Sequence, residues 1–337
     1  MVIPEFRRFK SDIDDIYAEA RENRDGRAAD YIPQLNLQEP EVDKFGVALC
    51  TVDGQRHSVG DAATYFAIES ACKPMNYCLA LEEYGADIVH RHIGHEPSGA
   101  SFNELALDKN NRPHNPMINA GAIMSCSFIQ LSDKQRKMAD GATGDVSNRG
   151  WAGERINYVM DRWRVATGGV KPRFSTDVYL SERSTADRNF ALAYYMREKQ
   201  AFPKDVDLED VLDFYFQCCS IEMNAESLSV FAATLANGGI CPISGERVFQ
   251  TETVRKCLSL MLSCGMYDYS GEFAFSIGLP AKSGVSGVMM IIVPNVMGFC
   301  CWSPRLDECG NSVRGIDFCQ RLVQRFNFHN YDSLTGE

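Results

Sequence analysis

The chain has 337 residues, of which 45% are hydrophobic and 23% charged, and its formal net charge is -11. This excess of acid argues against a nucleic-acid-binding protein, because no compensating basic patch is visible in the sequence. No run approaches the roughly eighteen uncharged apolar residues that a membrane span needs. The thirteen cysteines are scattered, without a C-x-x-C pair, which favours reduced thiols in a cytosolic or matrix-like compartment. Met1–Asp15 shows neither a signal nor a transit pattern, so no targeting segment is expected in this chain.

The first part of the chain predicts a polar surface helix over 10–27 and then a hairpin. Phe45–Thr51 is typical of a strand, Asp53-Gly54 of a two-residue turn, and Gln55–Val59 of the returning strand. The middle of the chain, from about 100 to 275, is mainly helical in pattern, with a surface segment over 132–150. Helices are expected there at 120–131, 152–166, 186–200, 208–217, 225–237 and 251–263.

Strands are expected again near the end of the chain. They are Phe275–Lys282, Val288–Val293 and Val296–Trp302, and a last amphipathic helix follows over 311–326. Early and late strands therefore bracket a long helical part. The simplest arrangement is an α+β fold: one mainly antiparallel sheet with flanking helices, plus a helical lobe.

This arrangement also predicts the domain organisation. Residues 1–29 are expected to form an N-terminal surface extension, and 30–333 a single domain. Its sheet lobe would comprise about 30–69 and 275–330, and its helical lobe about 70–274. Clefts form at such junctions, so chemistry is expected near residue 70.

Ser70 and Lys73 are the strongest candidates for that chemistry. They stand three positions apart at the start of the apolar stretch Met75–Leu81, so both side chains lie on one helical face. A serine there can be a nucleophile and the lysine its base. Pro74 suits a first helical turn, and the exposed amides of a helix N-terminus favour developing negative charge.

A second motif, Lys282-Ser283-Gly284, makes a serine–lysine enzyme a more specific prediction than Ser70 and Lys73 do alone. Serine–lysine acyl-transfer enzymes pair S-x-x-K with K-[ST]-G on a strand. The following segment Gly284–Gly287 is small enough to direct backbone N–H groups into a cleft as an oxyanion hole. Read alone, this glycine cluster also fits a strand bulge.

The three histidines His90, His92 and His95 invite a metal-site interpretation, which we reject. Neither strand alternation nor helical spacing easily brings all three together, and no cysteine stands nearby. No metal is therefore expected.

Several further segments resemble those of the glutaminase family. The match runs in order from about residue 30 to residue 332, and its pattern is most similar to the animal kidney-type and liver-type enzymes. Besides Ser70 and Lys73 it includes Tyr31–Leu35, Thr51–Gly54, Glu96–Gly99, Asn115–Ala122, Asp187–Phe190, Asp213–Gln217, Thr234–Gly239, Ser263–Asp268, Pro280–Val285 and Asn327–Asp332.

The resemblance implies a β-lactamase/transpeptidase-like fold and hydrolysis of L-glutamine to L-glutamate and ammonia, without metal or organic cofactor. Ser70 would be the nucleophile, Lys73 the general base, and the amides of Ser70 and Val285 the oxyanion hole. Glu182 would bind the substrate ammonium, and Tyr267 would help to relay protons. The implied pocket residues are Tyr31, Asn119, Glu182, Asn189, Tyr215, Tyr267 and Val285.

The resemblance also implies a homotetramer built from dimers, promoted by phosphate or a similar anion, and a mitochondrial matrix location, with a cytoplasmic one as the alternative. Three positions depart from the animal pattern. Glu69 replaces a glutamine, and its carboxylate is expected to favour protonated Lys73. Val288 replaces a glycine and is expected to stiffen the strand behind the oxyanion loop. Ala106 replaces an aromatic residue in the loop Phe102–Leu107, which the resemblance links to tetramer contacts and inhibitor binding.

Two other classes of protein stay open at this stage. One is a different serine–lysine hydrolase, acting on a β-lactam, peptide or ester. The other is a non-catalytic assembly protein of the same fold, against which the intact Ser70, Lys73 and Lys282 argue.

Overall fold

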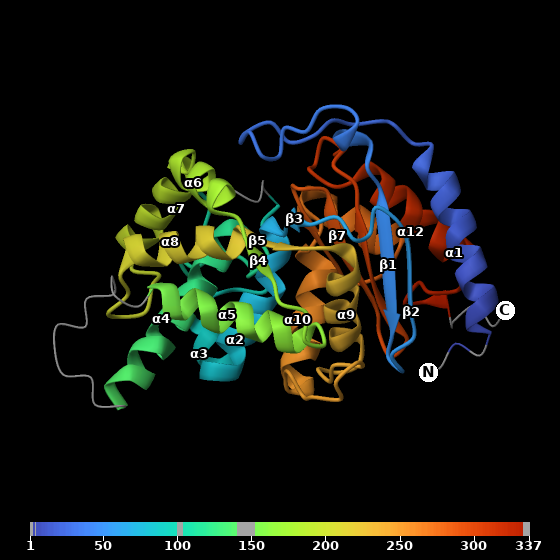
Figure 1. Ribbon diagram of the computed structural model, residues 1–337. Helices are drawn as coiled ribbons and strands as arrows, with labels where there is room; N and C mark the ends of the chain where they lie inside the picture. Colours follow the sequence, from blue (N-terminus) through green and yellow to red (C-terminus); the bar gives the residue numbers. More distant parts are fainter. Residues whose placement is uncertain (1–2, 4, 100–103, 140–151, 333–337) are drawn as a thin grey trace.

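The molecule contains a five-stranded antiparallel sheet with the strand order β2-β1-β8-β7-β6, and strands β1, β2 and β7 are labelled at the right of Figure 1. The computed structural model describes residue 3 and residues 5–99, 104–139 and 152–332. The pairing of β1 with β8, which sets Val47 opposite Cys301, joins the two ends of the chain in one sheet. The strands are β1 (Gly46–Thr51), β2 (Arg56–Gly60), β6 (Ala281–Gly284), β7 (Val288–Val293) and β8 (Met297–Trp302).

The inner strands are apolar at nearly every position because helices cover both faces of the sheet. In β7, Val288, Met290 and Ile292 contribute to one hydrophobic cluster, whereas Met289 and Ile291 contribute to the cluster on the opposite face. This is the two-residue alternation of a strand. The outer strand β2 is covered less and alternates between exposed and half-buried residues.

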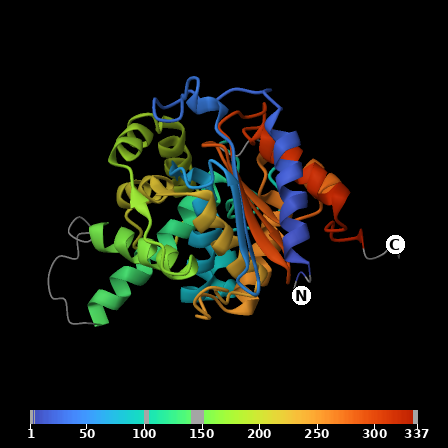
Figure 2. The ribbon, with the colours of Figure 1, turned by 45° about the vertical axis from the view of Figure 1, so that its right-hand side comes forward.

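One face of the sheet is covered by the first and last helices, α1 (Phe6–Arg21) and α12 (Val313–Arg325), which lie side by side (Figure 2). The buried residues of α1, among them Phe9, Ile13 and Ile16, follow helical spacing. Arg325 of α12 forms an ion pair with Asp12 of α1 at 2.9 Å. The N-terminal helix therefore packs against the domain.

The other face is covered by α9 (Ala225–Ala236), which contacts β1, β7 and β8. A capping box, in which Asn224 and Ser227 bond each other's backbone, begins this helix. Gly298 of β8 makes the contact possible, because a Cβ there would lie 2.1 Å from the backbone nitrogen of Ala233.

Most of the remaining helices form the helical lobe (Figure 1), but α11 (Ser270–Ser276) adds its buried Phe273 to the hydrophobic cluster on the α1 and α12 side of the sheet. A small sheet, with the strand order β3-β5-β4, connects it to the rest of the molecule. Its strands are β3 (Phe66–Ala67), β4 (Arg173–Phe174) and β5 (Ile221–Met223). The helices are α2 (Lys73–Tyr84), α3 (Ala86–His92), α4 (Asn119–Ala139), α5 (Ala152–Ala166), α6 (Thr176–Ser184), α7 (Asp187–Glu198), α8 (Leu208–Cys219), α10 (Thr251–Cys264) and α11 (Ser270–Ser276).

The predicted strand Phe275–Lys282 is wrong over most of its length. Residues up to Ser276 belong to α11, and β6 begins only at Ala281. Phe273 and Ile277 are buried at helical spacing while Phe275 is 83% exposed, so the apolar run reflects one face of a helix.

Other boundaries also differ from the sequence-based prediction. The first helix begins at Phe6, and α4 continues to Ala139, through the first part of the predicted surface segment; 140–150 lie outside the described residues. The short helices α3 and α6 were not predicted. In the part of the chain that the structure describes, no helix has the length and apolar character required to cross a membrane.

Candidate active site

Ser70 and Lys73 lie in one tight turn between the sheet lobe and the helical lobe. Strand β3 leads into a 3-10 helix (Glu69–Cys72), and α2 follows directly from Lys73, with Pro74 in its first turn. The Nζ atom of Lys73 is 2.5 Å from the Oγ atom of Ser70, and both side chains are buried. The predicted pair is thus within hydrogen-bonding distance.

Two residues beside this pair have left-handed backbone conformations, which residues other than glycine rarely adopt. Glu69 has a φ of 47° and Tyr267 a φ of 54°. Such conformations cost of order 1–3 kcal/mol and cluster at functional sites. Glu69 precedes Ser70 in the chain and Tyr267 contacts it, so their conformations support a site at this position.

Burial lowers the pKa of Lys73, which favours the neutral amine that a general base requires. Cys219, Cys72, Glu69 and Glu182 act in the opposite direction. Glu69 therefore raises the pKa of Lys73, as the sequence predicts, but the effect of burial is larger. Burial also raises the pKa of Glu69 itself well above its usual range, so the negative charge expected beside Lys73 is suppressed.

Tyr267 and Lys282 complete the surroundings of the pair. The hydroxyl of Tyr267 forms a hydrogen bond with Ser70 and donates to the carbonyl oxygen of Ser283 at 3.2 Å. Lys282 on β6 donates to the same carbonyl oxygen at 2.6 Å, and its Nζ atom lies 4.5 Å from the centre of the Tyr267 ring. Burial lowers the pKa of Lys282 well below its usual range, with a smaller contribution from Lys73.

A cavity of about 320 Å³ opens in front of Ser70. Seven of the residues that the sequence assigns to the site line it, and each comes from a different helix or loop. They are Tyr31, Ser70, Asn119, Glu182, Asn189, Tyr215 and Val285. Its dimensions suit a small polar ligand rather than a polymer.

Hydrogen bonds fix several of these side chains. The Tyr31 side chain is 45% exposed, but its hydroxyl donates to Glu182 at 2.7 Å. Three further side chains come from α4, α7 and α8. Asn119 donates to Asn189 at 3.0 Å, and the hydroxyl of Tyr215 donates to Asn119 at 3.2 Å. The cavity thus combines a buried carboxyl group with amide and phenol groups.

The glutaminase family model matches residues 26–331. The chain belongs to the glutaminase family. Mouse glutaminase liver isoform, mitochondrial, is 50% identical over 333 residues, covering 99% of this chain and 52% of its own length. A glutaminase of Trichormus variabilis is 40% identical, covering 96% of this chain and 91% of its own length. The chain therefore spans about half the length of the animal relatives it matches.

A solved structure of a probable glutaminase, ybaS, has the same fold. Its TM-score is 0.84 at 32% identity, and the match covers 96% of this chain and 98% of that chain. The predicted α+β, β-lactamase-like architecture of the glutaminase family is thereby confirmed.

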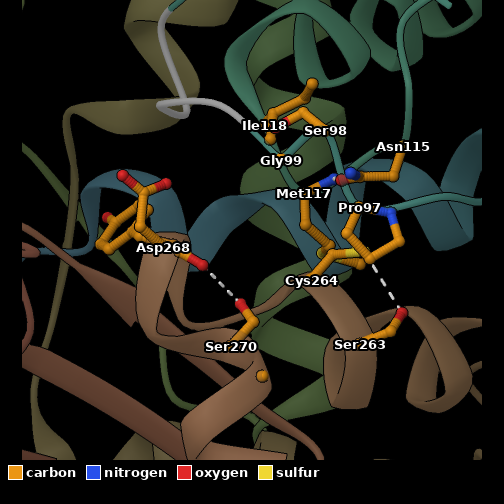
Figure 3. A pocket seen from close by; sticks show the side chains of 12 residues that line it. Pro97, Ser98, Gly99, Asn115, Met117, Ile118, Ser263, Cys264, Asp268 and Ser270 are labelled. Carbon is orange, nitrogen blue, oxygen red and sulfur yellow. Dashed lines mark hydrogen bonds between the residues drawn. The ribbon is translucent and has the colours of Figure 1, made fainter.

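A second cavity, of about 400 Å³, is lined in part by Tyr267, and Figure 3 shows how other lining residues, among them Met117 and Cys264, lie around it. Tyr267 was predicted as a pocket residue; it lines this second cavity, and its hydroxyl contacts Ser70, which lines the first. The hydroxyl of Ser270 donates to the Tyr267 carbonyl oxygen at 2.6 Å. The other lining residues include Pro97, Ser98, Gly99, Asn115, Met117, Ile118, Ser263, Cys264 and Asp268.

The histidine cluster has other bonding partners. His90 bonds Tyr77 at 2.9 Å and stacks on His95 with ring centres 4.0 Å apart, while His92 bonds the carbonyl oxygen of Ala201 at 2.6 Å. Among the described residues, no three His, Cys, Asp or Glu side chains are grouped as a metal site would require.

Two other positions singled out in the sequence lie outside the cavity. Val288 is buried in β7, opposite Gly284. Ala106 is half-buried in its loop, of which residues 102–103 lie outside the described part.

Four cavity residues were not predicted from the sequence: Thr185, Ala186, Arg188 and Cys219. Arg188 belongs to the segment Asp187–Phe190, which the sequence analysis singled out for its resemblance to the family. Cys219 carries no such signal, because its place in the cavity depends on how the end of α8 packs against the Ser70 turn. Glu69, which sequence analysis noted only as a departure, also lines the cavity.

Proposed function

We propose that the chain hydrolyses the side-chain amide of L-glutamine to L-glutamate and ammonia, through a γ-glutamyl ester on Ser70. The observation that carries the proposal is the 2.5 Å distance from the amino group of Lys73 to the Ser70 hydroxyl, at the base of a cavity lined by residues of the glutaminase pattern. Membership of the glutaminase family supports the choice of glutamine.

Glutamine would bind through both charged groups on its α-carbon. Glu182 is the partner for the ammonium group, since a carboxylate accepts a charge-assisted hydrogen bond. The amide and phenol donors of Asn119, Asn189 and Tyr215 suit the carboxylate end. These fixed contacts would set the reach of the substrate to Ser70.

Acylation would begin with attack of the Ser70 oxygen on the amide carbon, while neutral Lys73 accepts the hydroxyl proton. Burial of Lys73 favours this state because it lowers the pKa of the amine. The backbone amides of Ser70 and Val285 would hold the oxyanion. Ser70 is in the first turn of its short helix, where N–H groups have no partner within the helix.

Ammonia would leave once a proton reaches its nitrogen. Tyr267, whose hydroxyl contacts Ser70, would pass that proton from Lys73. The ester on Ser70 would then be hydrolysed by a water molecule that the same lysine activates. This reaction requires no metal or organic cofactor, and we expect activity to survive treatment with a chelator.

Assembly and location remain part of the proposal. By family resemblance we propose a homotetramer of two dimers, promoted by phosphate or a similar anion. We also propose a mitochondrial matrix location, and the name of the mouse relative describes that protein as mitochondrial. Light scattering with and without phosphate, and imaging of the tagged full-length protein, test these points.

The activity is tested by ammonia release from L-glutamine, comparing the wild type with Ser70→Ala. We expect the variant to retain less than about a hundredth of the rate, because loss of a catalytic nucleophile typically costs more than that. Ser125→Ala is a matched control: this buried serine donates to the Gly121 carbonyl oxygen at 2.9 Å, outside the cavity. Turnover of a chromogenic β-lactam without turnover of glutamine would identify a different serine–lysine hydrolase, and no turnover of either would favour an assembly protein.

A further inference from the structure

Two buried thiols that the proposed chemistry does not use lie beside Ser70 and Lys73. Cys72 belongs to the same 3-10 helix as Ser70 and is fully buried, and Cys219 is the last residue of α8. Both thiols are free, and they contact each other through a hydrogen bond. Thiols in contact can be joined as a disulfide with little movement of the backbone.

Only one of the two thiols is within reach of a small solute. Tyr215 and Cys219 are four residues apart on α8, so they share one face of the helix, and both line the cavity in front of Ser70. Cys72 has no exposed surface, and the Asn76 amide nitrogen lies 3.9 Å from its sulfur. A molecule in the cavity therefore meets Cys219 first, with Cys72 directly behind it.

We propose that Cys219 and Cys72 form an oxidation site, at which a small hydroperoxide converts the two thiols to a disulfide and reversibly inactivates the enzyme. The hydroperoxide has to fit a cavity of about 320 Å³, and hydrogen peroxide is the simplest member of the class. Formation of the disulfide is independent of the proposed function, whereas the expected loss of activity rests on it.

The reaction begins at Cys219. Its sulfur attacks one oxygen of hydrogen peroxide, the O–O bond breaks and an S–O bond forms, so the cysteine becomes a sulfenic acid. The thiol proton goes to the departing oxygen, which leaves as water. The positive charge of protonated Lys73 favours the Cys219 thiolate, which is the nucleophilic form of a cysteine.

Cys72 completes the reaction. Its sulfur attacks the sulfur of the sulfenic acid, the S–O bond breaks, an S–S bond forms, and the oxygen leaves as a second water with the Cys72 proton. The two thiols lose two electrons in total, and one hydrogen peroxide gains two and becomes two waters. Dithiothreitol restores both cysteines by thiol–disulfide exchange.

The first step is expected to be slow. The hydrogen bond with Cys72 and burial raise the pKa of Cys219 well above its usual range, and the charge of Lys73 offsets them only in part. Since the thiolate is the reactive form, little of Cys219 is reactive at neutral pH. The pair therefore responds to sustained oxidation rather than to a brief pulse, and its test requires excess peroxide.

The disulfide should stop catalysis because Cys72 stands between the nucleophile and the base in the chain. An S–S bond of about 2.05 Å is shorter than any hydrogen-bonded contact between thiols, so α8 and the Ser70 turn have to move closer together. Ser70 and Lys73 belong to that turn, and a displacement near 1 Å can cost about 10²-fold in rate. We expect the oxidised protein to lose activity at least about tenfold.

The test compares the wild type with Cys72→Ala and Cys257→Ala. Each protein is treated with excess hydrogen peroxide, which catalase then removes, and ammonia release from L-glutamine is measured before oxidation, after it, and after dithiothreitol. Peptide mass spectrometry without reduction identifies disulfides, and dimedone traps sulfenic acids. Cys257→Ala is the matched control, because Cys257 is buried and bonds another cysteine, Cys78, but neither lines the cavity in front of Ser70.

In the wild type and in Cys257→Ala we expect a disulfide between Cys72 and Cys219, the loss of activity, and its recovery with dithiothreitol. In Cys72→Ala dimedone should label Cys219, and prolonged oxidation should become irreversible, because a sulfenic acid without a second thiol proceeds to sulfinic acid. Full recovery of Cys72→Ala would overturn the proposal. That result is expected if oxidation of Cys264, which lines the second cavity, causes the loss.

Failure of this inference is distinguishable from failure of the proposed function. If the untreated wild type does not hydrolyse glutamine, the proposed function is wrong, and mass spectrometry still decides whether the disulfide forms. If the wild type hydrolyses glutamine and peroxide produces no disulfide between Cys72 and Cys219, only this inference is wrong. Cys72→Ser, which keeps the size of the side chain, replaces Cys72→Ala if circular dichroism shows that the alanine variant has not folded.

Discussion

Removal of the Tyr267 hydroxyl should separate catalysis from substrate binding. This hydroxyl contacts Ser70, whereas the proposed partner of the substrate ammonium is Glu182, which lines the first cavity. In Tyr267→Phe we therefore expect kcat to fall about 10²- to 10³-fold while KM changes little, because proton transfer by a positioned group contributes about 10²–10⁴. This loss corresponds to roughly 2.7–4 kcal/mol of activation free energy.

The same substitution should have a small effect on stability. A net hydrogen bond contributes about 0.5–1.5 kcal/mol, and the Ser283 carbonyl oxygen keeps a donor because Lys282 also bonds it, at 2.6 Å. The loss should thus be near the lower end of that range. The ring, which lies under the Lys282 amino group, is retained.

The measurements are steady-state ammonia release and urea unfolding of the same preparations. Tyr269→Phe is the control, since this tyrosine belongs to the same 3-10 helix (Tyr267–Tyr269) but packs in the cluster beneath α1 and α12. A fall in kcat of less than about threefold, or a rise in KM as large as the fall in kcat, would refute a role for the hydroxyl in the chemical step.

Three further predictions concern pH, specificity and assembly. The rate should rise with pH as Lys73 loses its proton, with a midpoint below the usual lysine pKa of about 10.4 because burial lowers it; Glu69→Gln should move that midpoint to lower pH in a pH–rate profile, since Glu69 raises the pKa of Lys73. Asparagine should be hydrolysed at least about 10²-fold more slowly than glutamine, because its amide carbon lies further from Ser70; comparable rates would contradict the contacts assigned to Glu182. Ala106→Phe should strengthen the proposed tetramer by up to about 1.5–3 kcal/mol if the ring is buried. It should also increase sensitivity to inhibitors that bind the loop Phe102–Leu107. Strong inhibition of the wild-type protein by such compounds would contradict this prediction.

The parts of the fold that depend on local pattern could be predicted from the sequence. The Val288–Val293 strand and the helix over 152–166 have the predicted bounds, because each combines a clear apolar period with turn residues at its ends. Ser70 and Lys73 were found for a similar reason: three residues within one turn fix their relation without information on the rest of the chain.

What the sequence did not reveal depends on tertiary packing. The apolar run around Phe275 has the composition of a strand, and only burial of its neighbours on one side makes it a helix. Cys219 and Glu69 reach the cavity through the packing of α8 against the Ser70 turn. Whether Glu69 carries a charge follows from its burial, which a single sequence does not display.

The pairing of β1 with β8 has a consequence for how the protein folds during its synthesis. A ribosome makes Ser70 and Lys73 long before β6, β7 and β8, at about 5–20 residues per second. Until those strands emerge, β1 lacks its inner neighbour, and the Ser70 turn lacks β6, whose Gly284 lies close to the Ile68 carbonyl oxygen. In the nascent chain Ser70 and Lys73 are therefore present before the strand β6 that packs against them. Activity should begin only when β6, β7 and β8 have paired with β1.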